Sequence, residues 1–315
     1  MTPAPSTPAD TLRGIVLMTA AMLIVPLMDI VAKYLSAVLP PLEIAFGRFA
    51  FQGAFAVLTA AIGPGFAALR TRRWRANLLR GVLLAGATFA FFTAVKVMPV
   101  ADAIAIFFVE PMILTGLSAV FLRETVGFRR WIAIAVGLAG ALLIIRPGFA
   151  EFGPVAVLPL VTAFLFALYL LITRHLSGED SMLSIQFTTA LGGAAVLGAA
   201  LLVVGATGAT AEPLVLPGVP ELGLLAVIGA ISFFAHGLIV RAFALAPASV
   251  LAPFNYLEIV SATLFGFLVF GDFPDLPTWG GIALIVGSGL YIAHRERVRA
   301  TVVAAGTADR TGAVE

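Results

Sequence analysis

The chain alternates between long apolar runs and short polar segments. Ten runs can be distinguished, at residues 14–36, 41–63, 77–97, 100–121, 131–146, 154–174, 183–204, 221–243, 247–270 and 279–294. An α-helix needs about 20 apolar residues to cross the hydrocarbon core of a bilayer. The pattern therefore predicts an all-α integral membrane protein with ten transmembrane helices, of which the fifth and tenth are the shortest.

The same arrangement of polar and aromatic positions occurs twice. Pro99, Glu110, Glu124 and Trp131 recur as Pro247, Glu258, Asp272 and Trp279, each 148 positions further along. Each half contains five predicted helices, so the second half must enter the membrane in the opposite orientation to the first. We therefore predict two inverted five-helix repeats, at residues 13–146 and 154–295. A linker at 147–153 joins them, and polar segments at 1–12 and 296–315 flank them.

The composition agrees with a membrane protein and narrows its chemistry. Hydrophobic residues make up 61% of the chain and charged residues 11%, whereas soluble domains average roughly 45–50% apolar and 25% charged residues. The absence of cysteine excludes disulfides, a thiol nucleophile and a thiolate metal site. No phosphate-binding loop, nucleophile elbow or histidine pair at metal-ligand spacing occurs. We expect no ATP-driven pump, no enzyme, no cofactor and no metal site.

Positive charges are distributed unevenly between the two sides of the predicted membrane. If the N-terminus is cytoplasmic, four of the 19 Lys and Arg residues fall within spans or at their outer ends, and the rest lie on the inner side. These four are Lys33, Arg48, Lys96 and Arg146. The positive-inside rule then predicts a multi-pass protein of the bacterial inner membrane with both termini in the cytoplasm. The net charge of +2 does not indicate a nucleic-acid partner.

Glu110 and Glu258 are the first candidates for a functional site. Each lies near the middle of an apolar run long enough to cross a bilayer. An ionisable side chain at that depth costs at least ~2.5 kcal/mol on insertion scales, so such residues usually bind a substrate or an ion, or relay protons. The two glutamates could therefore bind substrate or load and release protons. Alternatively, each is a buried hydrogen-bond partner that fixes helix packing.

The residues around Glu258 extend this candidate site. Asn255 and Phe254 precede it by three and four positions and share its helix face. In the first half, Phe107 occupies the position equivalent to Asn255. We therefore expect a cavity that is aromatic on one side and carries an amide on the other. The alternative is that Phe107 and Phe254 only pack against neighbouring helices.

The first two predicted helices contain paired charges. Asp29 and Lys33 lie at positions i and i+4, one turn beyond Pro26, on one helix face. An ion pair would lower the cost of placing both charges in the membrane, and it could act as a gate or a ligand clamp, or lie at the interface. Glu43 and Arg48 in the second helix have the same alternatives.

Three further groups of residues have weaker signals. His236 in the eighth predicted helix could relay protons or could be a packing residue. Residues at the start of the short fifth and tenth helices are expected to cap helices and anchor them at the interface: Glu124, Asp272, Trp131 and Trp279. Glycines in these two helices permit close helix approach, within the protein or in a homodimer: Gly137, Gly140, Gly281, Gly287 and Gly289.

Two segments of the sequence resemble a known family. They are PVADAIAIFFVEP followed by LRETVGFRRWIAIAVGLAGALLIIRPG, and the second copy PASVLAPFNYLEI followed by FGDFPDLPTWGGIALIVGSG. With these motifs the chain resembles the drug/metabolite transporter superfamily, in the branch with two EamA-type domains. The copies differ in that Glu110 precedes Pro111 whereas Glu258 precedes Ile259. The resemblance implies ten helices in two inverted halves, a central cavity between them, and secondary transport of small organic solutes.

The resemblance leaves the substrate open. Members of this superfamily handle amino acids, S-adenosylmethionine, riboflavin, sugars and quaternary amines. Several of the 25 phenylalanines fall near the expected cavity and could stack on a flat ring: Phe89, Phe91, Phe92, Phe107, Phe108, Phe233, Phe234 and Phe254. They favour an aromatic or vitamin-like solute such as riboflavin, with S-adenosylmethionine or an amino acid as alternatives. An intramembrane enzyme that uses Glu110 and Glu258 as acid and base is the alternative from another class.

Overall fold

The computed structural model describes residues 8–121, 128–175, 180–208, 212–246, 248–292 and 294. Their regular elements are all helices: α1 (Pro8–Leu35), α2 (Pro41–Ile62), η1 (Phe66–Leu69), α3 (Trp74–Val95), α4 (Val100–Phe107), α5 (Glu110–Phe121), α6 (Phe128–Phe152), η2 (Gly153–Val157), α7 (Leu158–His175), α8 (Met182–Thr207), α9 (Val219–Leu245), α10 (Ala248–Asn255) and α11 (Leu257–Phe270). A last helix, which we call the terminal helix, spans Leu276–Ile292. Glu124, Pro247, the tail 296–315 and part of the N-terminal segment 1–12 lie outside the described residues.

The predicted membrane class of the fold is confirmed. Within the described ranges, eight helical stretches are long and apolar enough to cross a bilayer. Two shorter apolar helices, Trp131–Ile145 and Leu276–Ile292, lie where the sequence predicts the short fifth and tenth spans. A helix satisfies all of its backbone hydrogen bonds internally, and this is the reason that continuous apolar segments fold this way in lipid.

The ends of several helices follow from local sequence. α2 begins at Pro41, whose fixed backbone angle suits the first turn and whose missing N–H is not needed there. α8 begins after Ser181, whose hydroxyl accepts a hydrogen bond of 3.1 Å from the N–H of Ser184. α8 and α11 end at Gly208 and Gly271, whose positive φ angles of 63° and 76° are available to glycine at little cost.

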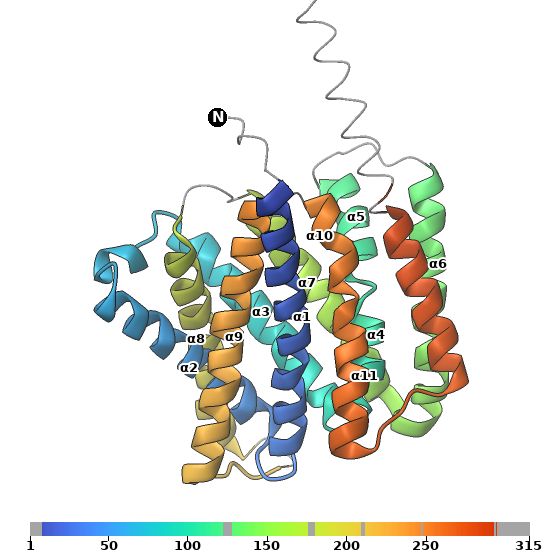
Figure 1. The fold of residues 1–315 in the computed structure, drawn as a ribbon. Helices are drawn as coiled ribbons and strands as arrows, with labels where there is room; N and C mark the ends of the chain where they lie inside the picture. The colour runs from blue at the N-terminus through green and yellow to red at the C-terminus, as the bar shows by residue number, and fades with distance from the viewer. Residues whose placement is uncertain are drawn as a thin grey trace, which may run out of the picture.

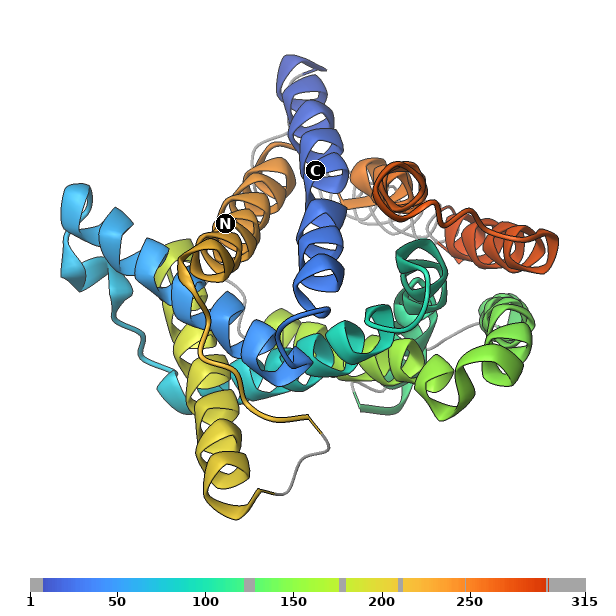
Figure 2. The same ribbon diagram turned by 90° about the horizontal axis from the view of Figure 1, so that it is seen from below.

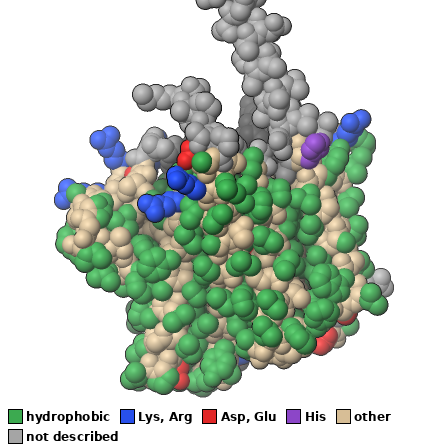
Figure 3. All heavy atoms as spheres, viewed as in Figure 1, with side chains coloured by type: hydrophobic (Ala, Val, Ile, Leu, Met, Phe, Trp, Pro, Cys, Tyr) green, Lys and Arg blue, Asp and Glu red, His purple; other side chains and the backbone are tan. Residues whose placement is uncertain are grey.

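The outer surface of the helix bundle is apolar along its flanks. Large side chains there are largely exposed, among them Ile62 at 80%, Leu202 at 76% and Leu268 at 66%. Figure 3 shows hydrophobic side chains covering the flank, with most of the visible Lys and Arg side chains at the end of the molecule where the N-terminus lies. Such a surface fits the hydrocarbon of a bilayer, with charges confined to the two ends.

Helices of the two halves of the sequence pack against each other. α1 contacts α9, α10 and α11; α2 contacts α8 and α9; and α3 contacts α7 and α8. Viewed from below, α1 lies between α9 and α11, while α6 and the terminal helix lie together at one side of the bundle (Figures 1 and 2). The largest buried apolar cluster, which includes Phe49, Ile104 and Ile228, therefore joins residues from both halves.

The fourth and ninth predicted spans are each broken into two helices, although the apolar pattern predicts that each is continuous. The first break falls at Phe108 and Val109, between α4 and α5, and the second at Tyr256, between α10 and α11. If α4 continued, the ring of Pro111 would clash with the carbonyl of Phe107, so the helix ends there. Phe108 and Tyr256 are 148 positions apart, and their ring centroids lie 5.1 Å from each other.

The glycines of α6 and the terminal helix pack inside the molecule. A Cβ atom on Gly140 would lie 2.9 Å from the carbonyl oxygen of Gly281, and one on Gly281 would lie 2.7 Å from that of Gly140. A Cβ on Gly137 would lie 2.7 Å from the sulfur of Met112. A Cβ on Gly287, by contrast, would meet nothing within 4 Å. Gly140 and Gly281 therefore serve internal helix packing, which is one of the two roles considered for them.

Candidate functional site

The two broken helices place both membrane glutamates at the start of a helix. Glu110 is the first residue of α5, and Glu258 is the second residue of α11. The first turn of a helix has N–H groups without intrahelical partners and carries a partial positive charge, which favours an anionic side chain there. Each break therefore provides a polar environment for a carboxyl group in the middle of an apolar segment.

A cavity of about 340 Å³ lies where these helix starts meet α1, α2, α3, α7 and α9. This volume falls within the usual range for small-molecule sites, which is roughly 300–1,000 Å³. Six of the eight candidate residues from the sequence line it: Asp29, Phe107, Glu110, His236, Asn255 and Glu258. Both membrane glutamates thus face one cavity, although they are 148 positions apart in the chain.

The other two candidate residues lie elsewhere. Phe254 is not part of the cavity lining and packs against an apolar cluster that includes Met18 and Leu251. Lys33 lies one turn beyond Asp29 and contacts the loop after α11. Phe89, Phe233 and Phe234 are also absent from the cavity lining, whereas Phe91, Phe92 and Phe108 belong to it.

Aromatic side chains of α3, α4 and α7 form one part of the cavity wall. The ring of Phe107 packs edge-on against Phe91 at 6.2 Å and against Phe166 at 5.4 Å between centroids. Phe166 in turn stacks on Tyr169. Edge-to-face contacts of this kind hold rings in fixed orientations, so this wall presents a rigid apolar surface to a flat ligand.

Polar groups reach the cavity from other helices. Asp29 comes from α1, Arg48 from α2, His236 from α9, and Asn255 and Glu258 from α10 and α11. The Nδ1 atom of His236 lies 2.7 Å from the carbonyl oxygen of Ser232, one turn earlier in α9. The amide oxygen of Asn255 is buried and has no hydrogen-bond partner among the described residues. The cavity therefore offers donors and acceptors to a solute in addition to its aromatic wall.

Arg48 is the cavity residue that the sequence pattern misplaces. The spacing pairs it with Glu43, but Glu43 instead accepts a hydrogen bond of 2.8 Å from the backbone N–H of Val215. Arg48 is buried, donates a hydrogen bond of 2.9 Å from Nε to the hydroxyl of Ser232, and donates a second one to Thr88. These partners come from α3 and α9, so no local spacing rule identifies them.

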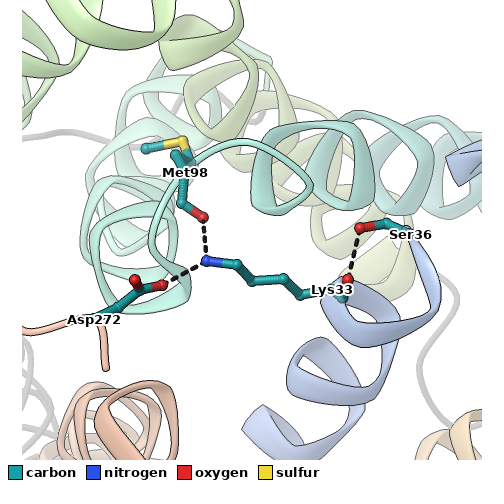
Figure 4. Close-up of polar contacts among 4 residues, drawn as sticks. All are labelled: Lys33, Ser36, Met98 and Asp272. Atoms are coloured by element: carbon teal, nitrogen blue, oxygen red, sulfur yellow. Dashed lines mark hydrogen bonds and ion pairs between the residues drawn. The ribbon is translucent and has the colours of Figure 1, made fainter. Parts of the chain in front are cut away.

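Lys33, near the end of α1, bonds to two residues that lie outside α1, Met98 and Asp272 (Figure 4). Its Nζ atom lies 2.5 Å from a carboxylate oxygen of Asp272 and donates a 3.2 Å hydrogen bond to the carbonyl of Met98. It also lies 4.7 Å from the ring centroid of Phe270. The predicted pair between Asp29 and Lys33 is therefore not formed. The two side chains sit in different environments because each has partners on other helices.

Asp272 also differs from its predicted role. The sequence indicates a helix cap at this position, but the cap of the terminal helix is Asp275, whose side chain accepts a 2.8 Å hydrogen bond from the N–H of Thr278. Asp272 lies three residues earlier and is free to pair with Lys33. The ion pair therefore connects α1 with the loop between α11 and the terminal helix.

A second cavity, of about 650 Å³, lies beyond Lys33. Its wall includes Lys33 and the residues up to Val38, together with Lys96, Glu221 and Phe270. Along α1, the first cavity is lined by residues between Met18 and Asp29, and the two linings have no residue in common. Lys33 thus belongs to the wall of the second cavity and lies one turn of α1 from Asp29, which belongs to the wall of the first.

A polar cluster ties α3 and α8 together at the end of the bundle where α1 begins. Asp180 accepts hydrogen bonds from Thr71 at 2.6 Å and from the amide of Asn77 at 2.7 Å. The slight burial of Asp180 acts to raise its pKa, but these hydrogen bonds, the N–H of Arg72 and the charge of Arg80 outweigh it and lower the pKa. In its ionised form, Asp180 therefore stabilises the folded protein relative to the unfolded chain.

We expect Asp180→Asn to lower stability at neutral pH but not in acid. A carboxylate with a lowered folded-state pKa contributes stability above its unfolded pKa, about 3.9, and loses it as the pH falls through the lower folded value. The loss at pH 7 should be about 1 kcal/mol, because hydrogen bonds to an exposed carboxylate are partly replaced by water. Thermal unfolding at pH 7, 5 and 3 checks this, with Glu221→Gln as a control. An equal deficit at all three pH values would contradict it.

Comparison with known proteins adds independent information. The model of the EamA-like transporter family matches residues 12–146 and 154–293. The S-adenosylmethionine uptake transporter of Rickettsia bellii is 29% identical over 269 residues, which cover 85% of this chain and 89% of that protein. The riboflavin transporter of Rhizobium johnstonii is 31% identical over 300 residues, covering 93% and 94%.

A solved structure has a similar fold. Described as the crystal structure of a protein, it superimposes with a TM-score of 0.62 at 22% sequence identity, over 89% of this chain and 96% of the other. At this identity the likeness concerns the fold alone.

Proposed function

The chain belongs to the EamA-like transporter family, and we propose that it is a secondary transporter that moves its solute through the central cavity by alternating access. Its relatives are named as transporters of small metabolites and not as enzymes. The observation that carries the proposal is a cavity of ligand size in which Glu110 of one half and Glu258 of the other converge. A site near the midplane between two halves is typical of secondary transporters.

In this proposal all ten apolar helices cross the membrane, as two inverted five-helix repeats. The support is that α4–α5 and α10–α11 are broken at positions 148 apart, and that a short apolar helix follows each broken pair. Both termini lie in the cytoplasm of a bacterial cell. In support, most of the Lys and Arg side chains visible in Figure 3 lie at the end of the molecule where α1 begins.

With this orientation, the contact at Lys33 is a closed gate on the periplasmic side. The cavity spans the middle of α1, because residues from Met18 to Asp29 line it. The second cavity is then a periplasmic vestibule, and the ion pair between Lys33 and Asp272 separates the two. Entry of solute from the periplasm requires that this contact break.

The proposed solute is a small organic metabolite that contains a flat ring. The aromatic wall formed by Phe91, Phe107 and Phe166 supports this class, since it presents a preformed apolar surface. Riboflavin and S-adenosylmethionine both meet this description, and each is the named solute of a relative. They are therefore the first probes to use.

Glu110 and Glu258 couple this transport to protons in the proposal. Each carboxyl group lies in the first turn of a broken helix and lines the cavity, so its protonation can change when the cavity opens to one side or the other. Protonation of either carboxyl group removes its charge, and this lowers the free-energy cost of moving the group into a less polar environment.

We expect Glu110→Gln and Glu258→Gln each to abolish the acceleration of flux by a proton gradient, because an amide keeps the shape of the side chain but cannot exchange a proton in this pH range. The measurement is uptake of riboflavin or S-adenosylmethionine into proteoliposomes with and without an imposed gradient. Glu151→Gln, at an exposed position of α6 outside both cavities, is the matched control. Gradient-driven flux that survives in the double variant would overturn the coupling role but leave the transporter standing.

A further inference from the structure

We infer that Arg48 binds a carboxylate of the transported solute, so that the solute combines a flat ring with a carboxylate and a cationic group. This inference rests on the proposed function, because it takes the central cavity to be the solute site. It adds a specificity-determining residue that the paired glutamates do not supply. If Arg48 has this role, the site prefers zwitterionic ring compounds to neutral ones such as riboflavin.

The position of Arg48 is costly for a charged side chain. It is the eighth residue of α2, well within an apolar helix, and 3% of it is exposed. An uncompensated charge in such a place is strongly unfavourable, so buried arginines are normally paired with a carboxylate or another anion. The partners of Arg48 therefore decide whether its charge is already balanced within the protein.

The direct partners of Arg48 are neutral. Nε donates to the hydroxyl of Ser232 and Nη1 to the hydroxyl of Thr88, and the guanidinium lies 4.7 Å from the ring centroid of Phe49. Among the described residues, no carboxylate forms a direct ion pair with Arg48, although Asp29 in the same cavity interacts with it electrostatically. A guanidinium has five N–H donors, and these two hydrogen bonds use two of them. Donors that these two bonds do not use are therefore available to a ligand in the cavity, and a zwitterion can place its carboxylate on Arg48 and its cation toward Asp29.

The guanidinium is also held in a fixed orientation. Thr88 belongs to α3 and Ser232 to α9, so Arg48 is fixed from two directions. Ser232 in turn donates to the sulfur of Met28 at 3.0 Å. A guanidinium fixed in this way can form two parallel hydrogen bonds with a carboxylate at little further cost in entropy. Lysine, a flexible point charge, could not reproduce this geometry.

The remaining charges of the cavity indicate the rest of the solute. Asp29, Glu110 and Glu258 are three acidic groups that share the cavity with a single arginine. Acidic groups favour a cationic centre such as an ammonium or a sulfonium. An amino-acid head group with its carboxylate on Arg48 and its cation toward Asp29 or Glu258 fits this set, and the rings of Phe107 and Phe166 remain for a flat ring.

The test compares ligands that differ by one carboxylate in proteins that differ by one side chain. The probes are S-adenosylmethionine and its decarboxylated analogue, with riboflavin and flavin mononucleotide as neutral and phosphorylated ring compounds. Purified wild type, Arg48→Gln and Arg48→Lys are assayed by equilibrium binding, and by flux in proteoliposomes. Arg241→Gln is the control, because Arg241 is exposed in α9 and outside the cavity lining.

We expect wild type to bind S-adenosylmethionine about 10- to 100-fold more tightly than the decarboxylated analogue, as two charge-assisted hydrogen bonds would give. In Arg48→Gln and Arg48→Lys this preference should largely disappear, while the affinity for the decarboxylated analogue is retained. Retained binding of that analogue also shows that the variants are folded. Arg241→Gln should keep the wild-type preference.

Several results would overturn the inference. Equal loss of both ligands in Arg48→Gln would show that the residue only holds α2, α3 and α9 together. A second such result is that riboflavin binds and moves equally well with and without Arg48, while S-adenosylmethionine does not bind. This would reject a carboxylate-bearing solute but leave the proposed transport function intact. A preference for flavin mononucleotide would assign a phosphate instead of a carboxylate. Failure of all four compounds to bind or to move would count against both proposals.

Discussion

Replacing Lys33 with alanine is expected to open the central cavity to the side of the membrane away from the N-terminus. The side chain holds Asp272, the carbonyl of Met98 and the ring of Phe270 together, and all three contacts are lost at once. The pair is largely shielded, with exposed side-chain fractions of 15% for Lys33 and 27% for Asp272, so water weakens it less than a surface pair. A charge-assisted contact of about 1.5 kcal/mol corresponds to roughly a tenfold change in population.

Site-specific labelling measures this shift directly. The chain has no cysteine, so Ala87→Cys in the cavity wall provides a single reactive thiol. In sealed vesicles, Lys33→Ala should raise the rate at which this thiol is modified by a membrane-impermeant maleimide from the periplasmic side about tenfold.

Two further variants serve as controls. The reversed pair, Lys33→Asp with Asp272→Lys, should restore slow labelling. Arg13→Ala, which removes an ion pair with Asp10 at the other end of α1 and outside both cavities, should not change it. Unchanged labelling in Lys33→Ala would show that the pair is not part of the closing contact.

The second large effect is expected at the contact between α6 and the terminal helix. In Gly281→Ala the new Cβ would lie 2.3 Å from a side-chain carbon of Ile144 and 2.7 Å from the carbonyl oxygen of Gly140. A backbone atom cannot rotate away, so the helices must separate. Overpacking of this kind costs typically 1–3 kcal/mol. At roughly 2–4 °C per kcal/mol, the melting temperature should fall by about 2–12 °C.

Gly287→Ala provides the matched control within the same helix. A Cβ atom there meets nothing within 4 Å, and alanine favours a helix over glycine by up to about 1 kcal/mol. Its melting temperature in detergent should equal that of wild type or exceed it. If both variants melted at the same temperature, the close approach of Gly140 and Gly281 would not limit stability.

Local properties of the sequence determined the class of the fold. Each apolar run had to become a helix, because backbone groups in lipid have no other partners, and this requirement acts within a single segment. The membrane class could therefore be predicted from the apolar runs, whereas the family and the transport of a small metabolite were predicted from the resemblance of two motifs; all three are confirmed. The glutamates could be selected as candidates on the same basis, since a charge in an apolar run is conspicuous.

The breaks in α4–α5 and α10–α11 were less accessible to prediction. Pro111 and Pro253 are the local signals, but proline is often tolerated in membrane helices, where neighbouring groups can satisfy the freed backbone. Whether a helix continues past such a residue depends on what packs beside it. Here Phe108 packs against Tyr256 at the two breaks, a contact between residues of different halves.

The sequence by itself determined which segments enter the membrane and which charges lie within it, because hydrophobicity and helical hydrogen bonding are local properties. Tertiary structure alone decided the partners of those charges. Lys33 pairs with Asp272, 239 positions away, and Arg48 bonds to Ser232, 184 positions away, although each has an acidic residue within five positions. Electrostatic and hydrogen-bond partners are selected by distance in space, and only the packing of the two halves sets that distance.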